Sequence, residues 1–382
     1  MTSFAARMPA LHTFELCPFN GYVIEGMNDI QFPLFAWVIF FGVVLTALAL
    51  DLGIASRKAH APTKFETTIW SIVWVSLALA FNGYVYWQFG STKGKEFFTG
   101  YLIELSLSID NLFVFLLIFS FFKVPAKYQH RVLFWGIFMA LVMRMAMIFA
   151  GAELVERFHA ILYFFGAFLV YTGVKMFFSD DDEFNPEESW IVSLTTRFIR
   201  ISKHYDGEKF FIRKDGKSQG TLLLLVLIVI NVADLIFAVD SIPAIFGITT
   251  DRFIVYTSNI FAILGLRTFF FLLLRVVEKF HYLQYGLAFV LTFIGVKMLL
   301  PLAVEILLYF SGHDDRSGLT PFLESFHRGE YNQLMINISL GVVVAALAVS
   351  VLLSLIFPAP PPDEVIPEAE ELLADADRPG RS

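Results

Sequence analysis

The chain has 382 residues, of which 57% are hydrophobic and only 16% charged, and its formal net charge is −7. Because a soluble domain carries about 25% charged residues, the composition excludes an ordinary soluble protein and predicts an integral membrane protein with several spans. The single cysteine, Cys17, excludes a disulfide framework and a metal site built on cysteine thiolates.

Nine stretches of the chain are apolar and long enough to be membrane helices, since about 20 residues of helix cross the ~30 Å hydrocarbon core of a bilayer. We therefore expect an all-α polytopic membrane protein. The spans are predicted at about 33–51, 67–89, 98–122, 130–150, 158–179, 220–246, 253–275, 280–300 and 334–357.

Four longer segments lie outside the spans. They are an N-terminal segment (1–32), a loop (180–219), a second loop (301–333) and an acidic, proline-rich tail (358–382) that we expect to be disordered. Within 180–219, "KFFIRKDGKSQG" predicts a short β-hairpin. Lys and Arg gather in "SRKAHAPTK", in "KVPAKYQHR" and in 180–219. The positive-inside rule then places the N-terminus and 301–333 outside and the tail in the cytoplasm.

The sequence contains an internal repeat that is recognisable in three places. The aligned pairs are "ELSLSIDN" (104–111) with "DLIFAVDS" (234–241), "IFMALVMR" (137–144) with "IFAILGLR" (260–267), and "VERFHAILYFFGAFLVYTGVKM" (155–176) with "VEKFHYLQYGLAFVLTFIGVKM" (277–298).

Each copy covers three predicted spans, one copy within 98–179 and the other within 220–300, after two leading spans in 33–97 and before a last span in 334–357. Because three is an odd number, the second copy enters the membrane from the opposite side. Such an inverted-topology repeat is typical of secondary transporters, whose substrate site lies near the bilayer midplane at the repeat interface.

Four carboxylates stand where the surrounding sequence is typical of membrane interior: Glu104, Asp110, Asp234 and Asp240. An ionised carboxylate at the bilayer centre costs roughly 2.5–3.5 kcal/mol on insertion scales, and packing alone gives no reason to keep four of them. The alternative is that they snorkel at helix ends or pair structurally with arginine. The position of Glu104 and Asp110, well inside 98–122, argues against snorkelling. We therefore expect these acids to be functional.

Oxygen-bearing side chains accompany the acids at helical spacing. The two stripes are Glu104, Ser108 and Asn111 in the first copy and Asn231, Asp234 and Ser241 in the second. Carboxylate, hydroxyl and amide oxygens suit hard divalent cations such as Mn²⁺, Ca²⁺ or Mg²⁺, whereas Zn²⁺ and Cu⁺ prefer imidazole and thiolate. The residues therefore predict a site for a hard divalent cation.

Asp234 and Asp240 are about 120° apart around a regular helix, so one ion cannot easily reach both. Pro243 removes a backbone N–H and frees the carbonyl of Val239, which a local break would offer as a further ligand. We favour Asp240, flanked by Ser241, as the metal ligand, with Asp234 close behind. Alternatively, the two aspartates face different partners, one the ion and the other a proton or an arginine.

Arg144 and Arg267 occupy matching positions in the repeat. A buried arginine in lipid needs a partner, and an intramembrane carboxylate is the obvious one. We interpret both arginines as counter-ions that stabilise the empty site, ahead of a direct gating role. Asp51, at the end of the first span, is predicted either to line a vestibule or to lie at the interface.

The stretches "ELSLSIDNLFVF", "QHRVLFWGIF", "DLIFAVDSIPAIFGIT" and "SNIFAILGLR" resemble the signatures of the TerC/Alx family of bacterial integral membrane proteins. The resemblance runs from "LDLG" through the last repeat helix. The family is associated with tellurite resistance in name and with manganese efflux in function. The resemblance thus implies a multi-pass exporter of Mn²⁺ in the bacterial inner membrane, with the acids of "ELSLSIDN" and "DLIFAVDS" as the metal path.

We therefore expect a secondary-active Mn²⁺ exporter, with Ca²⁺ or Mg²⁺ less favoured as substrates. Protons are the natural exchanged ion, because carboxylates that release metal take up protons. No prosthetic group, enzymatic activity or nucleic-acid partner is expected. The alternatives are an assembly factor or scaffold for other membrane proteins, and a tellurite-resistance component without ion transport of its own.

Overall fold

The computed structural model describes residues 33–55, 64–178, 201–202, 205–214, 217–274, 282–311 and 332–357. The N-terminal segment, the tail, and most of the two long loops therefore lie outside the described residues, as does the side chain of Asp51.

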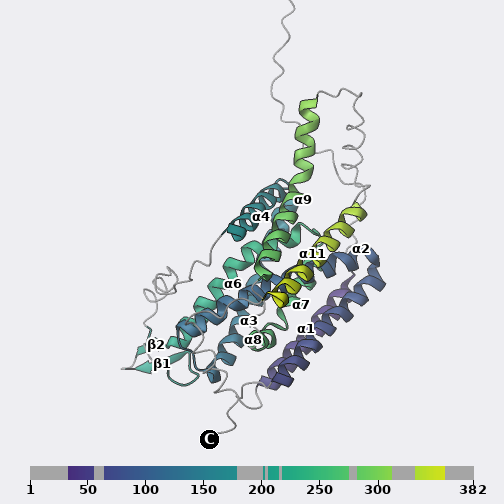
Figure 1. Ribbon diagram of the computed structural model, residues 1–382. Helices are drawn as coiled ribbons and strands as arrows, with labels where there is room; N and C mark the ends of the chain where they lie inside the picture. The colour runs from purple at the N-terminus through teal and green to yellow at the C-terminus, as the bar shows by residue number, and fades with distance from the viewer. Residues whose placement is uncertain are drawn as a thin grey trace, which may run out of the picture.

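Helices form almost all of the described structure (Figure 1). In chain order the elements are α1 (Leu34–Ala55), α2 (Lys64–Phe121), α3 (Ala126–Arg157), α4 (Ile161–Phe178), β1 (Phe211–Lys214), β2 (Lys217–Gly220), α6 (Leu222–Phe246), α7 (Arg252–Ile263), α8 (Leu266–Leu273), α9 (Leu283–Ser311) and α11 (Asn332–Ile356).

The predicted all-α polytopic membrane architecture is confirmed. Among the described residues, six helices are long and apolar enough to cross a membrane, or seven if α7 and α8, which are bent by 43° at their break, form one span. This number is smaller than nine for two reasons. The apolar part of α1 is short, Leu34–Ala49, and two predicted spans, 67–89 and 98–122, fall within the single long helix α2.

Helix α2 folds back on itself at Gly90. The backbone there has φ 88° and ψ 172°, a left-handed conformation that glycine adopts without steric cost. The rings of Phe81 and Phe97 lie 5.6 Å apart, although about sixteen residues of continuous helix would separate them by roughly 24 Å. Helix α2 therefore consists of two antiparallel arms, a first arm (64–89) and a second arm (91–121), which correspond to the two predicted spans.

The helices of the two repeats pack in reciprocal pairs. The first repeat consists of the second arm, α3 and α4, and the second consists of α6, α7–α8 and α9. The first helix of each repeat contacts the second helix of the other, since α2 packs on α7 and α8 while α3 packs on α6. The third helices, α4 and α9, make the most extensive contact and lie side by side in Figure 1.

Small residues at the α4–α9 contact show the same reciprocity. A Cβ atom added to Gly295 would meet the carbonyl oxygen of Gly166, and one added to Gly173 would meet that of Ala288. In the repeat alignment Gly173 matches Gly295 and Gly166 matches Ala288. The two contacts are therefore equivalent, and their order shows that α4 and α9 run antiparallel, as an inverted repeat requires.

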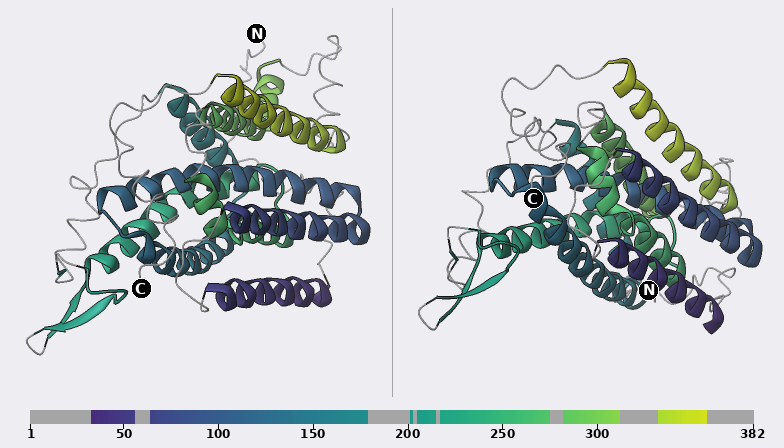
Figure 2. Two further views of the ribbon diagram at one scale, coloured as in Figure 1. Left: turned by 60° about the horizontal axis from the view of Figure 1, so that its bottom comes forward. Right: turned by 90° about the horizontal axis from the view of Figure 1, so that it is seen from below.

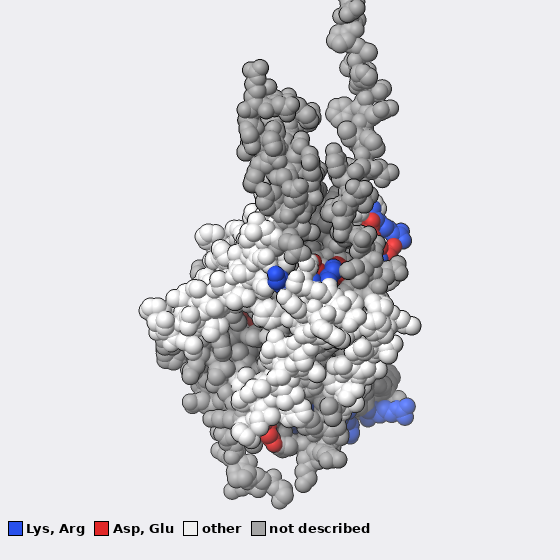
Figure 3. Space-filling model, turned by 90° about the vertical axis from the view of Figure 1, so that its right-hand side faces the viewer, with Lys and Arg blue, Asp and Glu red and all other residues white. Residues whose placement is uncertain are grey.

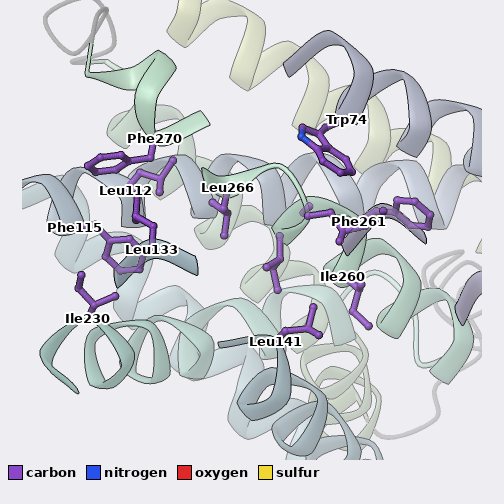
Figure 4. Close-up of a cluster of buried hydrophobic side chains, with 14 of the residues drawn as sticks. Trp74, Leu112, Phe115, Leu133, Leu141, Ile230, Ile260, Phe261, Leu266 and Phe270 are labelled. Carbon is purple, nitrogen blue, oxygen red and sulfur yellow. The ribbon is translucent and has the colours of Figure 1, made fainter. Parts of the chain in front are cut away.

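The interior of the bundle is apolar and rich in phenylalanine. Leu112, Phe115, Leu133, Ile230 and Phe270 bring together the second arm, α3, α6 and α8 (Figure 4). The exterior is also apolar: Leu34 and Trp87 are each 80% exposed. One face of the molecule carries few charged side chains, and these lie toward its upper and lower margins (Figure 3). A surface of this kind is suited to lipid.

The predicted β-hairpin is confirmed. Strands β1 and β2 are antiparallel, with Phe211 paired to Gly220 and Lys214 to Lys217. The hairpin lies at the start of α6, and the bend at which α2 folds back lies at the opposite end of the bundle (Figure 2). The hydroxyl of Tyr205, just before β1, donates to the carbonyl oxygen of Phe122 at 2.6 Å, which ties this segment to the α2–α3 connection.

The α4–α9 contact leads to a stability prediction. Gly295→Ala places a methyl group 2.6 Å from the carbonyl oxygen of Gly166, and overpacking of this kind costs typically about 1–3 kcal/mol. We expect a lower midpoint of thermal unfolding in detergent.

The matched control is Gly341→Ala in α11, where an added Cβ meets nothing within 4 Å. This variant is expected to be neutral or slightly stabilising, because alanine is the better helix former. Equal midpoints for the two variants would contradict the close approach of α4 and α9.

Candidate functional site

The most unusual group in the bundle is the guanidinium of Arg144, in the middle of α3, which is 1% exposed. Its Nε and Nη2 atoms donate to the two carboxylate oxygens of Asp234 at 3.1 and 2.9 Å. Nη1 donates to Glu104 and to the hydroxyl of Ser241, the latter at 3.3 Å. Arg144 thus joins three helices through polar contacts in an apolar interior.

Glu104 and Asp234 are the equivalent acids of the two repeats. They are 1% and 2% exposed, and one arginine neutralises only one of the two charges. Removing one partner of a buried ion pair leaves an uncompensated charge, so each of the three groups depends on the others. The prediction that Arg144 is a counter-ion of the intramembrane acids agrees with this geometry.

Several polar side chains near this cluster are buried without hydrogen-bond partners. Ser108 and Asn111, on the Glu104 stripe of the second arm, are 0% and 4% exposed. Within the described part of the chain, Ser108 Oγ, Asn111 Nδ2 and Asn231 Oδ1 have no partner. Asn231 Nδ2 donates to the Leu227 carbonyl at 2.7 Å. Buried polar atoms are normally satisfied, so the two oxygens are available to a cation and the amide nitrogen to a hydrogen-bond acceptor.

The structure separates the two aspartates of α6. Asp234 faces Arg144, whereas Asp240 accepts a weak hydrogen bond of 3.4 Å from Thr172 of α4. The alternative in which they face different partners therefore describes the geometry. Ser241, seven residues after Asp234 and so on the same helical face, contacts Arg144 together with Asp234, as the second oxygen-bearing stripe predicts.

The local break expected at Pro243 is absent from α6. The helix continues from Leu222 to Phe246 with the proline inside it. The side chain of Val239 is 47% exposed. The described α6 therefore shows no interruption that would offer the Val239 carbonyl as a ligand beside Asp240.

Two further predicted residues, Asp110 and Arg267, take no part in the hydrogen bonds that form the Arg144 cluster. Asp110 and Arg267 are half-buried, and each makes further polar contacts within the protein. Among the described residues, no group of three or more His, Cys, Asp and Glu is arranged to hold a metal ion. In this conformation, Glu104 and Asp234 bind the arginine.

A second ionic network, which no sequence pattern predicted, lies at the Gly90 end of the bundle. Lys93 follows the fold-back closely. Its Nζ atom lies 3.1 Å from Glu96 Oε2 and 2.9 Å from Oδ2 of Asp251, which is in the α6–α7 connection. Glu96 also accepts a hydrogen bond of 2.8 Å from Thr249. The signal was present in "STKGKE" and "GITTDR", but the sequence does not show that these stretches meet.

Comparison with known proteins identifies the family of the chain. The model of the integral membrane protein TerC family matches residues 89–359, from the fold-back of α2 through α11. The chain belongs to the TerC family. The match includes both repeats and every residue of the Arg144 cluster, whereas α1 and most of the first arm lie before it.

The TerC relatives include a membrane protein of Myxococcus xanthus that is 53% identical over 262 residues, covering 69% of this chain and 82% of the relative. The Alx protein of Escherichia coli strain K12, which bears the name of a membrane-bound redox modulator, is 48% identical over 295 residues, covering 73% of this chain and 92% of the relative. A membrane protein of Rickettsia bellii is 41% identical over 276 residues, covering 72% and 91%. No solved structure matches the chain.

The Arg144 cluster predicts a strong dependence of folding on this arginine. Arg144→Leu leaves Glu104 and Asp234 buried without their cation, and breaking a buried pair costs about 3–5 kcal/mol. Thermal unfolding in detergent measures the loss.

Two comparisons sharpen this measurement. The triple variant Arg144→Leu, Glu104→Gln, Asp234→Asn removes all three charges and is expected to recover much of the loss. Arg131→Ala removes an ion pair with Glu208 whose side chains are 42% and 45% exposed, and it is expected to change little. A mild effect of Arg144→Leu alone would count against the buried cluster.

Proposed function

We propose that this TerC family member is a secondary-active exporter of divalent metal ions, with Mn²⁺ as its main substrate. The observation that carries the proposal is the cluster in which Arg144 binds the equivalent acids of both repeats, Glu104 and Asp234. A substrate site at the interface of inverted repeats is the usual arrangement in secondary transporters.

Arg144 acts in this proposal as a tethered cation that occupies the acids when no metal is bound. A guanidinium remains charged at any physiological pH, so it cannot leave the acids by losing its proton. A divalent cation replaces one positive charge by two and satisfies both carboxylates. Arg144 must then move toward another acceptor, and the site alternates between an arginine-bound and a metal-bound state.

The ligand chemistry favours a hard ion. Carboxylate oxygens come from Glu104 and Asp234, and hydroxyl or amide oxygens come from Ser108, Asn111 and Ser241, without imidazole or thiolate. Hard divalent cations prefer such oxygens. The choice of Mn²⁺ over Ca²⁺ and Mg²⁺ rests on the resemblance to manganese-exporting members of the family.

Transport in this proposal is driven by exchange with protons, which the carboxylates take up as they release metal. Asp110 and Asp240, one in each repeat, are the further acids on this path. In this proposal the protein lies in a bacterial inner membrane, as the family resemblance implies. The lysine- and arginine-rich loops support an orientation with the N-terminus outside and the C-terminus in the cytoplasm.

The test is metal flux in liposomes that contain the purified protein, with Mn²⁺, Ca²⁺ and Mg²⁺ compared with and without a pH gradient. We expect Mn²⁺ flux that responds to the gradient. Asp110→Asn and Asp240→Asn are expected to abolish it, because neither amide can carry the charge or the proton.

Glu208→Gln is the control, since Glu208 lies beside the β-hairpin and is 45% exposed in its pair with Arg131. It should transport like the wild type. Wild-type flux through both aspartate variants would refute the assignment of the acids.

The same variants distinguish the alternative of an assembly factor or scaffold. Such a role depends on the surface and on the loops, so it tolerates neutral replacements at the intramembrane acids. The name of Alx suggests a thiol-based redox role. In this sequence such a role would depend on Cys17, its single cysteine.

A further inference from the structure

Asn259, in the middle of α7, is completely buried, and neither its amide oxygen nor its amide nitrogen has a hydrogen-bond partner in the described structure. Its neighbours behave differently. The hydroxyls of Thr257 and Ser258 each donate at 2.7 Å to a backbone carbonyl one turn earlier. Burying an amide with both polar groups unsatisfied costs free energy of folding. A function in which these groups gain partners would explain why Asn259 is at this position.

The packing of α7 shows which way Asn259 points. Val255 lies one turn earlier on nearly the same helical face. It packs in a cluster with Ile148 of α3 and with Ile242 and Ile245 of α6. Asn259 therefore faces the junction of α3 and α6, one turn further along α7.

The directions of the helices fix what lies at that level. Arg252 pairs with Glu153 and Glu156, and the Tyr256 hydroxyl donates to the Met145 carbonyl at 3.3 Å. Residue numbers thus rise along α7 as they fall along α3, and the two helices are antiparallel.

Helix α6 runs parallel to α3, since Gly136 lies against Ile230 and Gly151 against Ile242. One turn onward from Val255 on α7 therefore corresponds to one turn back on the other two helices. This step leads from Ile148 to Arg144 on α3 and from Ile245 to Ser241 on α6. Arg144 Nη1 and Ser241 Oγ are 3.3 Å apart. Asn259 consequently lies beside the Arg144 cluster.

The repeat alignment shows that this amide is present on one side only. Asn259 aligns with Gly136 of the first repeat. An added Cβ at Gly136 would lie 3.4 Å from Ile230, so that position is filled by an apolar neighbour. The second repeat alone brings an amide to the junction.

We infer that Asn259 is a further ligand residue of the cation site. Its Oδ1 atom coordinates the divalent cation when Arg144 withdraws, and its Nδ2 atom donates to one of the two carboxylates. A neutral amide oxygen is a normal ligand for hard divalent cations, and this role gives both orphaned atoms a partner. The inference rests on the proposed function and adds a residue to the same site.

The test compares Asn259→Leu with the wild type in the purified full-length protein, by equilibrium binding of Mn²⁺ and by thermal unfolding with and without Mn²⁺. Leucine has a similar size and removes an unsatisfied amide, so the metal-free protein should not become less stable. Mn²⁺ affinity should fall by about 10-fold or more, as for the loss of a metal-site contact, and stabilisation by Mn²⁺ should shrink accordingly.

Two variants accompany this comparison. Asn259→Asp retains an oxygen and should bind Mn²⁺ more like the wild type than like Asn259→Leu. Asn82→Leu is the matched control, because its Oδ1 is also buried and unpartnered but lies on the first arm of α2, which supplies none of the side chains that bind Arg144. It should leave Mn²⁺ binding unchanged.

The outcomes separate the inference from the proposed function. If the wild type binds Mn²⁺ and Asn259→Leu binds it equally well, the inference is overturned and the proposed function stands. If the wild type does not bind Mn²⁺, both are overturned. If Asn259→Leu does not fold, Asn259→Ala, which adds no bulk, takes its place with the same expected loss of binding.

Discussion

A charged arginine buried in an apolar bundle is the constraint on which the rest of this structure depends. Arg144 cannot lose its charge, so the fold must bring carboxylates to it from two other helices. Glu104 and Asp234 meet this need only if the second arm of α2, α3 and α6 pack closely at one level. The apolar core above and below the cluster excludes water and so makes this polar contact decisive for the arrangement of the helices.

The repeat explains why two acids are present, and the arginine explains where the repeat stops being symmetrical. The α4–α9 contact follows the repeat closely, with the same small residues meeting twice. Near the charges the two halves differ: Arg144 joins both equivalent acids, and Asn259 stands opposite a glycine in the alignment. Approximate two-fold symmetry between the repeats thus determines how the helices pack, while single residues that occur in only one repeat give the site its chemistry.

Much of this architecture could be predicted from the sequence, because apolar length reveals membrane helices and the alignment pairs Glu104 with Asp234. Helical periodicity also places Ser241 on the face of Asp234, where both side chains contact Arg144. Other features depend on contacts between distant segments. The meeting of Lys93 with Asp251 and the convergence of Arg144 and Asn259 follow from how the helices cross, which no local pattern encodes.

The connections between the first and second helices of the two repeats are secured by different chemistry. At the Gly90 end, charged side chains close the α6–α7 connection, and the outer pair of Arg252 with Glu156 is open to water, with side chains 39% and 59% exposed. At the hairpin end, the hydroxyl of Tyr205 holds the α2–α3 connection itself, and the exposed Arg131–Glu208 pair lies on α3 beyond that connection. Salt screens exposed ion pairs but not a neutral hydrogen bond. Ionic strength therefore acts unequally on two connections that are built from equivalent pieces.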